Sequence, residues 1–85
     1  MNNTDKIMTP LYEIAGYIVG TAVSKQNEQE ALNRIVNNSG QAILYVSLIE
    51  NEFEIEIDDE DINLDFFTSF DYVEGIIKKR LANAS

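Results

Sequence analysis

The amino-acid sequence predicts an all-α fold, a four-helix bundle with a long first loop and a short third helix. Three observations support this prediction. Apolar residues recur at helical spacing in three stretches, and residues typical of helix starts stand before them. The alternating stretch at residues 54–57 finds no partner strand elsewhere in the chain, and an isolated strand has nothing to pair with. Eighty-five residues form one domain, near the lower size limit for a single hydrophobic core.

The first helix is expected at about residues 10–23. Thr9 can supply a hydroxyl cap, and Pro10 suits the first helical position, where its missing N–H costs nothing. The apolar residues that follow at helical spacing are Leu11, Ile14 and Ile18.

A long connection is expected between the first helix and the second. Residues 24–38 are mostly polar, and within them residues 28–36 could form a helical turn or two. The Asn37–Gly40 cluster then breaks the helical pattern. Residues 1–8 and 82–85 are expected to be flexible ends around a domain of residues 9–81.

The second helix is expected at about residues 40–53, with Ser39 as its N-cap. The stripe expected to face the core consists of Ile43, Val46, Ile49 and Phe53. Ser47 is the one polar residue between Ala42 and Ile49, which leaves two alternatives open. Either neighbouring helices wrap around this helix, or Leu44 and Tyr45 form an exposed apolar patch that recognises an enzyme or a second copy of the chain.

The acidic run Asp58–Asp61 invites comparison with a calcium-binding loop, but the comparison fails. The sixth position of that loop would be Leu64 instead of glycine, and the twelfth would be Phe70 instead of glutamate. We therefore interpret Asp58 or Asp59 as the cap of a short third helix.

The last helix is expected to begin after Ser69, which can cap it. The residues expected to face the core are Phe70, Val73, Ile76 or Ile77, and Leu81, and Phe66 and Phe67 before them are also expected in the core. Lys78, Lys79 and Arg80 are expected in the final turn, where cations suit the negative end of the helix dipole.

Composition excludes several functional classes. The chain has no cysteine and no histidine, so it lacks thiolate nucleophiles, imidazole bases and the usual zinc ligands, and we expect neither an enzyme nor a metal site.

A net charge of −9 disfavours nucleic acid and attracts partners with basic faces. No apolar run approaches the roughly 20 residues that span a bilayer, and the first residues lack the pattern of a secretory signal, so a cytoplasmic protein without membrane contact is expected.

Residues 48–61 resemble a segment of the acyl carrier protein family. Their sequence is Leu-Ile-Glu-Asn-Glu-Phe-Glu-Ile-Glu-Ile-Asp-Asp-Glu-Asp. That family has the same run of apolar residue, acids and phenylalanine, followed by an acidic and isoleucine step into its third helix. Thr68-Ser69-Phe70 is similar to the start of the family's fourth helix. The resemblance covers residues 9–81, and counting back from Phe53 without a gap places Ser39 on the serine that carries 4'-phosphopantetheine.

The resemblance implies that the chain holds an acyl or aminoacyl group as a thioester on 4'-phosphopantetheine at Ser39, in fatty acid, polyketide or peptide biosynthesis. The implied partners are a phosphopantetheinyl transferase and acyl-transferring or synthase enzymes with basic or apolar docking faces. Their expected contact residues are Asn38, Gly40, Gln41, Leu44, Tyr45 and Leu48. A monomer is expected, with a homodimer as the alternative.

The chain departs from the family's Asp-Ser-Leu motif, because it reads Asn38-Ser39-Gly40. Leu44 also stands where the family often has an acid for docking enzymes. The alternative function is therefore a carrier-like fold without the prosthetic group, acting as an acidic protein-interaction adaptor.

Overall fold

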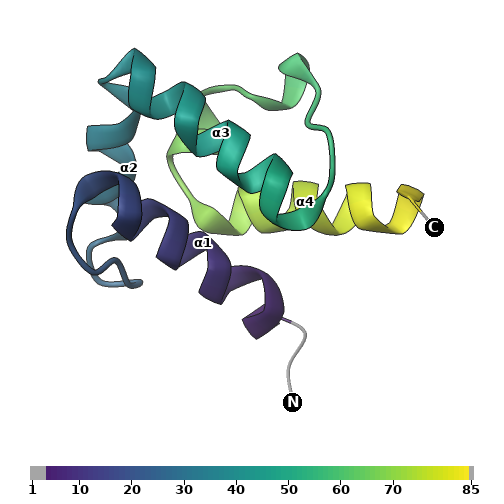
Figure 1. The fold of residues 1–85 in the computed structure, drawn as a ribbon, viewed down its shortest axis with the longest axis horizontal. Coiled ribbons are helices and arrows are strands. Elements are labelled where there is room, and N and C mark those ends of the chain that lie inside the picture. The colour runs from purple at the N-terminus through teal and green to yellow at the C-terminus, as the bar shows by residue number, and fades with distance from the viewer. Residues whose placement is uncertain (1–3, 85) are drawn as a thin grey trace.

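The chain folds into four α-helices arranged around one core (Figure 1). This computed structural model describes residues 4–84. The helices are α1 (Thr4–Val19), α2 (Glu28–Val36), α3 (Ser39–Phe53) and α4 (Phe70–Ala84), with the 3-10 turns η1 (Asp59–Asp61) and η2 (Leu64–Phe67) between α3 and α4. The all-α, four-helix prediction is confirmed. None of the helices within the described residues has the length and apolarity needed to cross a bilayer.

Helix α1 begins earlier than the sequence pattern indicated. The helix runs through Thr4–Met8, so the flexible segment expected there is wrong for these residues, and residues 1–3 of that segment lie outside the described residues. Ile7 is buried one turn before Leu11, which extends the apolar stripe towards the N-terminus. Pro10 therefore lies inside the helix, where it removes a backbone hydrogen bond. The burial of Ile7 offsets this loss.

Helix α1 also ends earlier, at Val19 instead of residue 23. Gly20 takes the left-handed conformation with φ of 80° and donates its backbone N–H to the carbonyl of Gly16 at 2.8 Å. A Cβ on Gly16 would lie 3.1 Å from the carbonyl oxygen of Thr21, so the chain turns back closely over this position. The two glycines thus end α1 and allow the next segment to pack against it.

The long first loop of the prediction is largely occupied by α2. Ala31, Leu32 and Ile35 are buried and fix this nine-residue helix to the core. The Glu28 carboxylate, also buried, accepts a hydrogen bond from the backbone N–H of Phe70 at 3.2 Å. Helix α2 therefore caps the start of α4 across the molecule.

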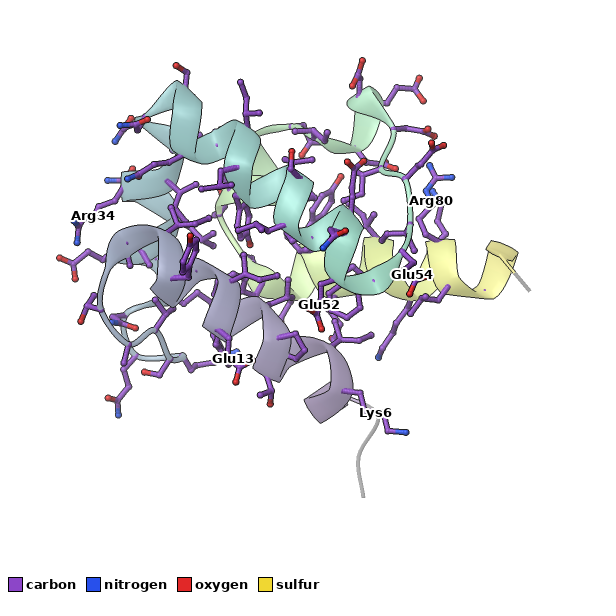
Figure 2. All side chains as sticks on the ribbon, in the orientation of Figure 1. Lys6, Glu13, Arg34, Glu52, Glu54 and Arg80 are labelled. Atoms are coloured by element: carbon purple, nitrogen blue, oxygen red, sulfur yellow. The ribbon has the colours of Figure 1, made fainter. Side chains whose placement is uncertain are left out.

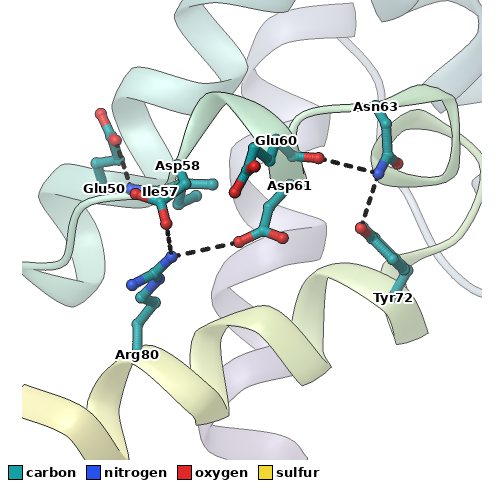
Figure 3. Close-up of polar contacts among 8 residues, drawn as sticks. All are labelled: Glu50, Ile57, Asp58, Glu60, Asp61, Asn63, Tyr72 and Arg80. Carbon is teal, nitrogen blue, oxygen red and sulfur yellow. Dashed lines mark hydrogen bonds and ion pairs between the residues drawn. The ribbon is translucent and has the colours of Figure 1, made fainter.

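The expected short third helix consists of the two 3-10 turns η1 and η2. Ile55 and Ile57 before them are both buried and attach this segment to the core. Asp58 occupies the N-cap position of η1 but makes no capping hydrogen bond. Its carboxylate instead pairs with Arg80, which also lies 3.4 Å from Asp61 (Figure 3).

Helix α4 is capped as predicted, because the Ser69 hydroxyl accepts a hydrogen bond from the backbone N–H of Asp71 at 3.0 Å. The helix continues to Ala84, so residues 82–84 of the expected flexible end are helical, and Ser85 lies outside the described residues. The prediction that Lys78, Lys79 and Arg80 lie in the last turn is therefore wrong, and Arg80 instead pairs with Asp58 and Asp61. The hydrogen bond to Asp58, with the nearby charges of Asp58 and Asp61, raises the pKa of Arg80.

Aromatic rings form the centre of the core. Tyr45 of α3 is fully buried, with its ring centroid 5.8 Å from Phe66, 6.0 Å from Phe67 and 6.4 Å from Phe70. Leu81, expected to face inward, is 40% exposed because the core ends near Ile77.

Candidate functional site

Ser39 is the first residue of α3, and its side chain is exposed. The sequence predicted this serine as the N-cap, and that prediction is wrong. Asn38 is the N-cap, because its side-chain oxygen accepts a hydrogen bond from the backbone N–H of Gln41 at 3.0 Å. No hydrogen bond of the Ser39 hydroxyl is found among residues 4–84. The hydroxyl is therefore open to solvent and has no structural task in the helix.

The corner between α2 and α3 fixes the position of Ser39. Helix α2 ends at Val36, and the backbone N–H of Asn38 donates to the carbonyl of Ile35 at 3.1 Å. Asn38 then adopts an extended conformation, with φ of −125° and ψ of 108°, before α3 begins. This tight connection keeps Ser39 at the outer end of the bundle.

An apolar groove of about 440 Å³ opens beside Ser39. Its walls come from the end of α2, from α3 and from the segment around η1 and η2. The lining residues are Val36, Ser39, Ala42, Ile43, Val46, Ser47, Ile62 and Phe67. We call this space the Ser39 groove. It can hold an apolar group that is attached to, or lies next to, the serine.

A second groove of about 500 Å³ shares Val36 and Phe67 with the Ser39 groove. The rest of its lining is more polar and comprises Gln29, Glu30, Asn33, Leu64 and Thr68. Val36 and Phe67 therefore lie between the Ser39 groove and a second groove whose lining includes more polar side chains.

The residues that the sequence assigned to partner contact fall into two groups. Asn38, Gly40 and Leu44 are exposed near Ser39, with Leu44 39% exposed, and Gln41 is half-buried there. Leu48 is also half-buried, but it lines a separate groove between α1 and α3 with Ile14 and Tyr17.

Tyr45 does not belong to this surface, because it is fully buried. Ile43, which was expected in the core, is instead 68% exposed. The orientation of α3 explains both differences. Turning Tyr45 inward places its ring against Phe66, Phe67 and Phe70, and the burial of a large ring outweighs the burial of one isoleucine.

Sequence reasoning missed Ile43, Ile62 and Val36 as residues that form the Ser39 groove. Val36 falls at the end of the expected helical turns of residues 28–36, and Ile62 carried no signal of its own. The helical spacing placed Ile43 on the core stripe. Only the position of the η1–η2 segment across from α3 brings these residues together.

Tyr45 and Glu28 are two of the residues that bury a polar side-chain atom without a hydrogen-bond partner among the described residues. Neither the Tyr45 hydroxyl nor Glu28 Oε1 has a hydrogen-bond partner among the described residues. Burial, and next the negative charge of Glu28, raise the pKa of Tyr45 well above its usual value of 10.0. This pair lies in the core, and neither residue lines the Ser39 groove.

Glu13, Glu52 and Arg34, labelled in Figure 2, are among the exposed charged side chains of the bundle. Within the described part of the chain, no three Asp or Glu residues are grouped in a way that could hold a metal ion.

Comparisons of the chain with protein-family models, with curated proteins and with solved structures found no match.

Proposed function

We propose that this protein carries an acyl or aminoacyl group as a thioester on 4'-phosphopantetheine attached to Ser39, and presents that group to partner enzymes. The observation that supports this most strongly is the state of the Ser39 hydroxyl. It is exposed at the start of α3, and Asn38 has taken over the capping that would otherwise explain a serine there.

The surroundings of Ser39 fit this prosthetic group. The first amides of a helix lack intrahelical partners, and with the positive dipole end they favour a phosphodiester. When bound, the group supplies the thiol that holds the cargo, and the chain has no cysteine of its own. The Ser39 groove offers Val36, Ile43 and Phe67 as apolar walls that would bind the cargo and exclude water from it.

The protein itself would perform no chemistry in this role. It would raise the effective concentration of the attached group at successive active sites. Its partners would be a phosphopantetheinyl transferase and the acyl-transferring or synthase enzymes of fatty acid, polyketide or peptide biosynthesis, in the cytoplasm.

The test is co-expression with a broad-specificity phosphopantetheinyl transferase, followed by intact mass spectrometry. The wild-type chain is expected to gain the mass of one phosphopantetheine arm. Ser39→Ala is expected to gain none. Ser47→Ala removes the other serine of the Ser39 groove and should be modified like wild type. A wild-type chain that keeps its unmodified mass would contradict the proposal.

The second candidate is an acidic adaptor that carries no arm, and Asn38 favours it. The resemblance implies an aspartate there, whose carboxylate helps the transferase hold its metal ion, and an amide is a weaker ligand for a hard cation. The variant Asn38→Asp separates the two candidates, because aspartate caps a helix as well as asparagine does. If the protein is a carrier, Asn38→Asp is expected to be modified faster than wild type, whereas an adaptor would remain unmodified in both forms.

A further inference from the structure

A groove of about 480 Å³ lies at the C-terminal end of α1. Its walls come from α1 and from the turn that follows this helix. The lining residues are Tyr12, Glu13, Gly16, Tyr17, Gly20, Thr21, Ala22 and Val23. We call this space the α1 groove. It shares no lining residue with the Ser39 groove.

Two tyrosine rings line the α1 groove. Tyr17 is 75% exposed, so the packing of the core does not account for its ring. Tyr12 is half-buried, and its ring packs edge-on against Phe70 with the ring centroids 5.1 Å apart, which holds it in place. Gly20 leaves open space in the same lining, because a Cβ there would meet no atom within 4 Å. The face of an aromatic ring is electrostatically negative and attracts cations.

The end of α1 is negative and is not neutralised by the helix itself. The last carbonyls of a helix carry partial negative charge, and α1 has no basic residue in its last turn. Glu13, labelled in Figure 2, is exposed and forms no ion pair among residues 4–84. The α1 groove therefore combines a helix C-terminus, a carboxylate and two aromatic rings, each of which attracts a cation.

The charges around Tyr12 are mainly negative as well. Burial, and next the charge of Glu28, raise the pKa of Tyr12, and the charges of Asp71 and Glu74 raise it further. Lys25 acts in the opposite direction, but its ammonium lies 3.8 Å from the Asp71 carboxylate and Lys25 does not line the α1 groove. The chain thus surrounds this groove with more negative than positive charge.

We infer that the α1 groove binds the guanidinium group of an arginine side chain from a partner protein, which stacks on Tyr17 and pairs with Glu13. A guanidinium is planar and weakly hydrated, stacks on aromatic rings and pairs with a carboxylate through two parallel hydrogen bonds. An ammonium is more strongly hydrated and cannot stack, so it uses the rings less well. The inference goes beyond the proposed function and does not depend on it, because neither tyrosine nor Glu13 lines the Ser39 groove.

The experiment titrates the isotope-labelled full chain with N-acetyl-arginine amide at low ionic strength and follows the backbone amide signals by NMR. Saturable shifts are expected at Gly16, Gly20 and Thr21. N-acetyl-citrulline amide has nearly the same shape without the charge and should cause no saturable shift there. N-acetyl-lysine amide is expected to bind about fivefold more weakly than the arginine compound.

Variants at the exposed residues of the groove assign the contacts. Glu13→Gln removes the carboxylate, and Tyr17→Leu removes the ring but keeps an apolar side chain, so each is expected to weaken binding about threefold or more. Tyr17→Phe keeps the ring and should bind like wild type. Glu56→Gln removes an exposed acid outside the α1 groove and should also bind like wild type. The four variants should keep the wild-type circular dichroism spectrum.

Several results would overturn the inference. One is a wild-type chain without saturable shifts at Gly16, Gly20 and Thr21. Another is equal binding of the citrulline compound, which would show that charge is not recognised, or of the lysine compound, which would assign the groove to any cation. Shifts that concentrate on residues 52–61 and persist in Glu13→Gln and Tyr17→Leu would show a general attraction to the acidic chain instead of a site.

Discussion

Alkaline pH should destabilise the protein through Tyr45. The hydroxyl is fully buried, and both burial and the charge of Glu28 raise its pKa well above 10.0 in the folded state. In the unfolded chain the hydroxyl loses its proton near pH 10, while the folded protein retains it. Above that pH the unfolded state binds fewer protons, so the free energy of unfolding falls as pH rises. Tyr45 therefore lowers the free energy of unfolding progressively above pH 10, by at most about 1.4 kcal/mol for each pH unit.

The assay is urea denaturation followed by circular dichroism at pH 8, 10 and 11, for wild type and Tyr45→Phe. The phenylalanine keeps the ring and removes the titrating hydroxyl. As pH rises above 10, the free energy of unfolding should therefore fall less in Tyr45→Phe than in wild type. In Glu28→Gln most of the divergence should persist, because burial is the larger cause of the raised pKa. Parallel pH dependences in wild type and Tyr45→Phe would refute the reasoning, since they would show that Tyr45 titrates alike in both states.

Three further substitutions test individual packing and charge contacts. Gly75→Ala on exposed α4 should stabilise the fold by about 0.5–1 kcal/mol, measured by urea denaturation, because no atom lies within 4 Å of the added Cβ. Leu32→Ala should lower the free energy of unfolding by about 2–5 kcal/mol if α2 is part of the core, whereas a value near zero would show a loosely attached loop. Arg80→Gln should lower Tm, because Asp58 and Asp61 lose the cation that pairs with them. Added salt should then raise the Tm of this variant, because it screens the repulsion between the acids. Lys79→Gln is the control and should show neither effect.

The long apolar spacing predicted that helices exist near residues 10–23, 40–53 and after Ser69, but the predicted caps were less reliable than the spacing. Ser69 was predicted correctly, since its hydroxyl caps α4 as the pattern indicated. Helix α2 was predicted only as a turn or two, because nine residues are too few to form a stable helix alone. Its helix depends on Leu32 and Ile35 packing against the rest of the core, and on the contact of Glu28 with α4. Such contacts between distant segments cannot be read from local spacing.

The sequence predicted the place of Ser39 but not the rotation of α3 about its axis. A helix that is apolar nearly all round carries little information about which side faces inward. Tyr45 faces the core in place of Ile43 because its ring packs against three aromatic residues from later in the chain, Phe66, Phe67 and Phe70. The predicted contact surface therefore contained Tyr45 by mistake and lacked Ile43.

The first two turns of α3 contain residues that folding stability does not explain. Asn38 alone satisfies the cap, so Ser39 is free. Gly40 lies in regular helix, and an added Cβ would approach only the Asn38 side-chain oxygen, at 3.4 Å, so the backbone does not require glycine although it lowers helix stability. Ile43 and Leu44 expose apolar surface that the core does not use. Ser39, Gly40 and the exposed Ile43 and Leu44 are each neutral or unfavourable for folding, and all lie within two turns of the Ser39 hydroxyl. A partner that contacts this end of the helix would account for all of them together.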